Sequence, residues 1–156
     1  MMTRRTLLAS LAGLAGIGLA ARTGQTTGAD PKAAKAAKST VAKLELTDAE
    51  WKSRLTADQF YILRKEGTEA PGSSALNREK RKGTYHCAGC DHALFSSATK
   101  YESGTGWPSF YDPLPNALGF KTDYKMLLPR TEYHCVRCEG HQGHVFNDGP
   151  APTGKR

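Results

Sequence analysis

Four cysteines in two C-x-x-C pairs are the residues whose chemistry is easiest to recognise. Cys87 and Cys90 form the first pair, and Cys135 and Cys138 form the second; the sequence contains no others. Each pair lets two thiolates converge from one tight turn, and two such turns supply the tetrahedral set of a structural Zn²⁺. Two disulfides or a redox-active pair are the alternative. A closed four-thiolate site leaves no position for substrate, so we expect this zinc to hold the fold and not to catalyse.

The two pairs belong to an internal repeat. Tyr85-His86-Cys87 leads into the first pair, and Tyr133-His134-Cys135 leads into the second. Because four thiolates already complete a zinc site, we expect His86 and His134 to lie beside the metal or at the surface.

Two further segments carry side chains suited to ligand binding and proton transfer. In SGTGWPSF, residues 103–110, Trp107 stands in a loop of Gly and Pro, where an indole more often forms a pocket wall than part of a core. In HQGHVFNDGPAPTGKR, residues 141–156, His141 and His144 lie three positions apart. Alone, such a histidine pair is equally compatible with zinc binding or with hydrogen bonds at a strand end.

These segments together resemble one known family. KYESGTGWPSF, the paired C-x-x-C knuckles, ILRKEGTEAPGSSALNREKRKGTYHCAGCDHALFSS and HQGHVFNDGPAPTGKR are similar to the methionine-R-sulfoxide reductases, the B-type enzymes that reduce one epimer of methionine sulfoxide in peptides. The resemblance runs from about Leu44 to Arg156. It implies an oxidoreductase that repairs oxidised methionine in proteins under oxidative stress, with a thioredoxin-like or other thiol reductant.

The resemblance also implies roles for individual residues. Trp107 would pack against the S-methyl group of the substrate, while His141, His144 and Asp148 would position the sulfoxide oxygen, hold water and move protons. Arg156 matches the arginine two residues before the nucleophile, where a fixed positive charge lowers the pKa of a thiol. In the family, a cysteine thiolate attacks the sulfoxide sulfur and becomes a sulfenic acid, which a thiol then reduces.

Two features depart from the family pattern. The nucleophilic cysteine is expected two positions beyond Arg156, so the printed chain is expected to have the pocket without the attacking group and to lack the last strand. A fragment, a broken reading frame and a pseudoenzyme are the explanations left open. The position of a resolving cysteine is occupied by Thr105, so recycling would need direct reduction of the sulfenic acid or a thiol supplied from elsewhere.

The elements expected around these residues are short. Two capping boxes, Thr47 to Glu50 and Thr56 to Gln59, predict two helices that end at Gly67. From residue 83 onward, short β-like runs (GTYHC, HALF, GFKTDY, TEYHC and GHVF) alternate with Gly, Pro, Asn and Asp. We therefore predict a mainly β (α+β) fold, in which small antiparallel sheets form an open barrel and a structural zinc joins the two knuckles.

The N-terminal part predicts export. Arg4 and Arg5 form a twin-arginine pattern before the apolar stretch LLASLAGLAGIGLAA, so residues 1–29 are interpreted as a signal peptide. Residues 30–43, rich in Ala and Lys, are interpreted as a flexible linker, and residues 44–156 as the reductase domain. The expected location is periplasmic, with no stable membrane association after processing; an uncleaved signal would instead anchor the protein to the membrane.

Composition limits the alternatives. The net charge of +7 invites a nucleic-acid interpretation, but cleavage after residue 29 removes three of the 22 basic residues and none of the 15 acidic ones, which leaves +4. That charge, without interleaved aromatic and basic residues on a strand, speaks against nucleic acid. The remaining alternative to an enzyme is a non-catalytic, zinc-held module that binds peptides.

Overall fold

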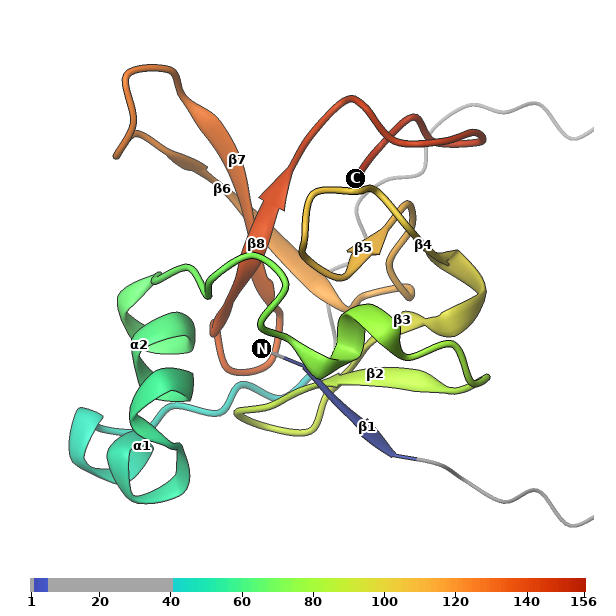
Figure 1. Cartoon of the computed structure of the whole chain (residues 1–156). Helices are drawn as coiled ribbons and strands as arrows, with labels where there is room; N and C mark the ends of the chain where they lie inside the picture. The colour runs from blue at the N-terminus through green and yellow to red at the C-terminus, as the bar shows by residue number, and fades with distance from the viewer. Residues whose placement is uncertain (1, 6–40) are drawn as a thin grey trace, which may run out of the picture.

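The computed structural model describes residues 2–5 and 41–156. Two short helices lie against one end of an assembly of small antiparallel sheets (Figure 1). The helical elements are α1 (Asp48–Arg54), α2 (Ala57–Lys65) and the 3₁₀ turns η1 (Ala75–Arg78) and η2 (Ser97–Thr99). The strands are β1 (Met2–Arg5), β2 (Thr84–Cys87), β3 (Ala93–Ser96), β4 (Lys100–Tyr101), β5 (Ser109–Phe110), β6 (Leu118–Asp123), β7 (Arg130–Cys135) and β8 (His141–Val145).

The strands form three separate sheets in the described part of the chain. Their orders are β1-β2-β3, β4-β5 and β6-β7-β8, and every pairing is antiparallel. The predicted small antiparallel sheets are therefore confirmed, and among the described residues they do not close into a barrel. The register of β6-β7-β8 is important for the site, because it sets which side chains of these strands share a face.

The helix starts agree with the sequence prediction. The Thr47 side chain accepts a hydrogen bond from the backbone amide of Glu50, and the Thr56 side chain accepts one from that of Gln59. In return, the side chains of Glu50 and Gln59 accept from the backbone amides of the two threonines, so both capping boxes are formed. Reciprocal capping satisfies amides that would otherwise lack partners, which helps helices as short as these to form.

The core contains all four cysteines. They pack with Trp51 and Leu63 of the helices and with Leu94 of β3, each of which is at most 2% exposed. The four candidate metal ligands are thus part of the apolar core. Loss of a bound metal should therefore destabilise the core packing, and disruption of the core should weaken metal binding.

The end of α2 differs from the prediction. Glu66, one residue before Gly67, takes the left-handed conformation with φ 56° that closes the helix. This conformation is unfavourable for a residue with a side chain. The carboxylate of Glu66 binds Lys121 of β6, at 2.6 Å, and Lys125 of the following hairpin. These two ion pairs tie the helix end to the hairpin and offset the backbone cost.

Replacing Glu66 with glutamine is expected to lower stability in a pH-dependent way. The two lysines lower the pKa of Glu66 to about 2, from an ordinary value of 4.5. A depressed pKa stabilises the folded state above the unfolded-state pKa, and this contribution is lost as the pH falls toward the folded-state pKa. Because the side chain is 28% exposed, screening by solvent limits the effect to about 1 kcal/mol.

Urea unfolding at several pH values measures this prediction. The deficit of Glu66→Gln should be constant from pH 7 to 5 and shrink below about pH 4.5, while Glu45→Gln, at an exposed position, should match the wild type throughout. A deficit that grew on acidification would contradict the assignment.

The predicted signal peptide and linker fall mainly on residues 6–40, which lie outside the described residues. In the part of the chain that the structure does describe, no helix has the length and apolarity needed to span a membrane.

Candidate functional site

The two C-x-x-C segments fold in the same way, as their sequence repeat predicts. In the first, the amide of Asp91 donates to the carbonyl of Cys87 at 2.8 Å; in the second, the amide of Glu139 donates to the carbonyl of Cys135 at 2.9 Å. Asp91 and Glu139 both have a left-handed backbone, with φ 61° and 58°. Each turn therefore curls back on itself and directs both of its cysteines to one side.

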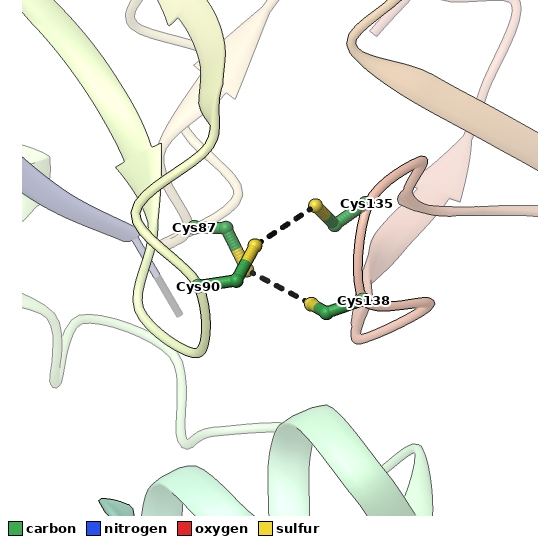
Figure 2. Close-up of side chains that lie close together, drawn as sticks. All are labelled: Cys87, Cys90, Cys135 and Cys138. Carbon is green, nitrogen blue, oxygen red and sulfur yellow. Dashed lines mark hydrogen bonds between the residues drawn. The ribbon is translucent and has the colours of Figure 1, made fainter. Parts of the chain in front are cut away.

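The four sulfur atoms meet between these turns. Figure 2 shows the two cysteines at the end of β2 and in the turn after it facing the two at the end of β7 and in its turn, with Cys87 opposite Cys138 and Cys90 opposite Cys135. The Sγ–Sγ distances of these two pairs are 3.6 and 3.5 Å, and all four ligand atoms lie within 4.8 Å of one another. Sulfurs about 2.3 Å from a tetrahedral zinc lie about 3.8 Å apart. The arrangement therefore fits a four-thiolate metal site, and the thiols are not joined as disulfides.

The electrostatics of the cluster also fit a cation. Hydrogen bonds from Cys135 and the other thiols lower the pKa of Cys87 far below its ordinary value, while the pKa of Cys138 is raised because it serves as a donor to the same neighbours. Four thiols so close together cannot all ionise without a compensating charge. A divalent cation at their centre would hold all four as thiolates.

Backbone and side-chain contacts fix the two turns to the rest of the domain. The Arg64 guanidinium donates to the carbonyl of Cys138 at 2.8 Å, and that of Arg137 donates to the carbonyl of Cys90 at 2.9 Å. The Gln142 amide lies 3.4 Å from the sulfur of Cys87. Gln142 also lines the pocket described next, so β8 connects the cysteine cluster to that pocket.

A pocket of about 360 Å³ lies beside β8 and brings together most of the predicted site residues. Trp107, His141, His144 and Arg156 line it. Asp148 does not line the pocket; its exposed side chain accepts a hydrogen bond from Arg156. The remaining lining residues include Ile62, Thr68, Glu69, Leu76, Thr105, Arg130, Gln142 and Phe146.

The loop before β5 holds Trp107. The indole Nε1–H donates to the carbonyl of Glu69 at 2.9 Å, which fixes the ring against the opposite side of the pocket. Gly106 allows this approach, because its φ is 91° and a Cβ there would lie 2.8 Å from Pro71. Trp107 is therefore the pocket wall that the sequence predicted, and not a core residue.

His144 is held from behind by a buried carboxylate. Its Nε2 lies 2.7 Å from Asp123 Oδ2, and the same oxygen accepts from the Arg130 guanidinium at 2.7 Å. Asp123 is only 6% exposed. The backbone amide of Lys125, together with His144 and Arg130, holds the pKa of Asp123 well below its ordinary range.

His141 has a different environment. Its Nδ1 lies 3.0 Å from Glu132 Oε1, close enough for electrostatic attraction, but the ring is not aligned for a hydrogen bond. Glu132, 2% exposed, is also 3.2 Å from Lys121. Burial lowers the pKa of His141, and the attraction to Glu132 offsets this only in part. We therefore expect His141 to be neutral at pH 7. The centre of its ring lies 5.3 Å from that of His144.

The residues 146–156 fold back onto the end of β8. Phe146 and Arg156 exchange both backbone hydrogen bonds, at 2.9 and 3.0 Å, as in an antiparallel pair. The Arg156 guanidinium lies 4.3 Å from the centre of the Phe146 ring and binds Asp148 through two bonds of 2.9 and 2.7 Å. Arg156 is thereby fixed in the pocket wall, and Asp148 acts on the site through it.

Sequence reasoning did not find the two buried carboxylates, Asp123 and Glu132. Both sit in β-like runs, where a charged residue usually faces solvent. The one signal available was that Asp123, near the end of the run GFKTDY, and Arg130, just before the run TEYHC, flank the same predicted turn, where opposite charges can pair.

The comparisons with known proteins point to one family. The family model described as the SelR domain matches residues 55–156. The chain is 53% identical over 114 residues to the peptide methionine sulfoxide reductase MsrB of Methanosarcina barkeri, which covers 72% of this chain and 80% of that protein. The chain belongs to the MsrB family. It is also 48% identical to the mitochondrial methionine-R-sulfoxide reductase B2 of Rattus norvegicus, over 73% of this chain and 70% of that one.

Another relative is longer. The chain is 52% identical to the chloroplastic peptide methionine sulfoxide reductase B1 of Oryza sativa, but it spans only 52% of that protein's length. The matched region of the MsrB-family chain includes both the cysteine cluster and the pocket.

Proposed function

We propose that this protein is a peptide-methionine (R)-S-oxide reductase, which returns methionine-R-sulfoxide in proteins to methionine at the expense of a thiol. The observation that carries the proposal is the pocket that gathers Trp107, His141, His144 and Arg156 in a chain of the MsrB family. Trp107 comes from the loop before β5, the two histidines come from β8, and Arg156 comes from the segment that folds back onto β8. The approach of Trp107 to the other three residues therefore depends on the fold and not on sequence proximity. Relatives named as methionine sulfoxide reductases support the same activity.

The geometry suggests how each residue would act. The indole of Trp107 would contact the S-methyl group, and the imidazoles of His141 and His144 would face the sulfoxide oxygen. As a thiolate attacks the sulfur, the oxygen must gain a proton, and His144 is the proposed donor because the carboxylate of Asp123 holds its ring in place. Methionine leaves and the thiol becomes a sulfenic acid. Arg156 would stabilise the attacking thiolate by its charge.

The strand pairing at the chain end supports a place for the nucleophile. Because Phe146 and Arg156 form a hydrogen-bonded antiparallel pair, a chain continuing in the same register would place the second residue after Arg156 opposite His144. The nucleophilic cysteine is expected at that position. We therefore propose that any residues following Arg156 in this register would pair with the outer edge of β8 and extend the sheet toward an open barrel, and that a cysteine at the second of these positions would present its thiol beside His144.

Zinc is proposed as the resident metal. The four thiolates of Cys87, Cys90, Cys135 and Cys138 suit a closed tetrahedral site, and their burial in the core supports a structural role. The metal would cross-link the two turns and would take no part in the reaction.

Recycling is proposed to use an external thiol. Thr105 stands at the position of the resolving cysteine, and its hydroxyl is 2.8 Å from that of Ser103. Reduction of the sulfenic acid would then proceed directly, by a thioredoxin-like protein or another thiol.

Export is proposed from the N-terminal sequence. The Arg4-Arg5 pattern supports a twin-arginine signal in residues 1–29, followed by a linker over residues 30–43. The proposed location of the protein is therefore periplasmic.

Turnover of the complete protein tests the function. The zinc-loaded protein, including any residues encoded after Arg156, is incubated with dithiothreitol and with a peptide that contains either the R or the S sulfoxide. Methionine formed from the R epimer alone is the expected result. A folded, zinc-loaded protein with a cysteine at the expected position that reduced neither epimer, or both equally, would overturn the proposal and would favour a binding module.

A further inference from the structure

The sheet β6-β7-β8 directs an unusual set of charged side chains to the pocket side. In the register, Lys121 pairs with Glu132, Glu132 pairs with His144, and Asp123 pairs with Arg130. Paired residues in antiparallel strands share a face, so these side chains lie on one face of the sheet. Asp123 lies on β6 and His144 on β8, and β7 lies between these two strands (Figure 1). The contact between their side chains therefore spans β7.

Asp123 is almost fully occupied as a hydrogen-bond acceptor. Its Oδ1 accepts from the backbone amide of Lys125 at 2.8 Å, and its Oδ2 accepts from Arg130 and lies 2.7 Å from His144 Nε2. A carboxylate with these donors stays ionised and has no proton to give. The proton in the contact with His144 therefore sits on Nε2 of the imidazole.

The other ring nitrogen, Nδ1, is left for the pocket. Within residues 2–5 and 41–156, Nδ1 of His144 has no hydrogen-bond partner, and His144 lines the pocket. The groups nearest to the ring are His141, Glu132, Asp123 and Arg130. Only the pocket remains as a source of a partner for Nδ1.

We propose that Asp123 is a positioning residue for the reaction: it fixes the proton of His144 on Nε2 and thereby makes Nδ1 the atom that faces substrate. The proton given to the sulfoxide oxygen is then a second one, which the doubly protonated ring carries on Nδ1, while the proton on Nε2 stays with the contact to Asp123. The role of Asp123 in turnover rests on the proposed function, but the tautomer assigned to His144 does not. Arg130 balances the charge of Asp123, so that the carboxylate orients the imidazole without taking up its proton. A carboxylate that orients a histidine in a Ser-His-Asp site has the same task, and its replacement by Asn there produces the wrong tautomer.

A purely structural role is the competing explanation. Asp123 and Arg130 form a buried ion pair at the base of the β6-β7 hairpin, and loss of one partner of such a pair destabilises a fold. Stability alone therefore does not separate the two explanations, and the test must observe the imidazole itself.

Long-range ¹H–¹⁵N correlation spectra of the ¹⁵N-labelled, zinc-loaded chain distinguish the two tautomers of each histidine. Wild-type His144 is expected as the Nε2–H tautomer at a pH where its ring is neutral. In Asp123→Asn, whose amide group can donate to Nε2, His144 should change to the Nδ1–H tautomer. In Arg130→Gln, which breaks the same ion pair but keeps the carboxylate, Nε2–H should persist.

An Nδ1–H tautomer in the wild type would overturn the inference, even if Asp123→Asn failed to fold. An unchanged tautomer in folded Asp123→Asn would overturn it equally. In the complete enzyme, Asp123→Asn should lower kcat about 100-fold or more while leaving KM within about twofold. If the wild-type protein shows no reductase activity, the proposed function fails while the tautomer result still decides the positioning claim.

Discussion

Replacement of Cys135 by serine is expected to abolish zinc binding and to unfold the domain. Cys135 is completely buried, and its sulfur is 3.5 Å from that of Cys90. Structural zinc sites contribute about 10–16 kcal/mol in small zinc-dependent folds, whereas whole domains are stable by only about 5–15 kcal/mol. Since the four cysteines are also part of the apolar core, other contacts have little capacity to compensate.

Metal analysis and circular dichroism measure this outcome. The wild type should contain one zinc per chain and melt cooperatively, while Cys135→Ser should contain less than a tenth of an equivalent and show no cooperative melt. His86→Gln is the matched control: His86 stands next to Cys87, but its ring bonds to the carbonyl of Asp91 and not to the cluster. A metal-free Cys135→Ser protein that melted like the wild type would contradict a structural metal.

In a protein that carries the nucleophilic cysteine, replacement of His144 by glutamine is expected to reduce kcat/KM for methionine-R-sulfoxide about 100- to 10,000-fold, the range for loss of a general acid. Glutamine keeps much of the volume and can still accept or donate a hydrogen bond, but it cannot transfer a proton to the sulfoxide oxygen. Zinc content and melting temperature should change little, because His144 is in contact with Asp123 and not with the cysteines.

Asn147→Ala is the control for this experiment. Asn147 lies in the same segment, but its side chain accepts from Lys155 at the surface and does not line the pocket. Its activity should stay within about twofold of the wild type. If His144→Gln were as active as Asn147→Ala, His144 would not be the proton donor.

The local features of the fold were predictable because they depend on neighbouring residues. The capping boxes before α1 and α2 and the two C-x-x-C turns formed as predicted, since each is specified within four or five positions. The end of α2 was not predicted correctly, because the left-handed residue Glu66 is held by two lysines of a distant hairpin.

The site divides in the same way. Trp107, His141, His144 and Arg156 could be found from their motifs, and they do converge on one pocket. Asp123 and Glu132 could not, because their contacts with the histidines depend on the register of β6, β7 and β8. Strand register follows from tertiary packing, which a local pattern does not specify.

The pocket beside β8 is proposed to bind methionine-R-sulfoxide, and ligand titration of the 156-residue chain measures this binding, which needs neither nucleophile nor reductant. The sequence has two tryptophans, so their indole N–H signals are easily assigned. A peptide with the R sulfoxide should shift the Trp107 signal saturably, and the S epimer should do so only weakly. The signal of Trp51, buried in the core, should not move. Equal shifts with both epimers, or no shift of the Trp107 signal at all, would contradict selective binding of the R sulfoxide in this pocket.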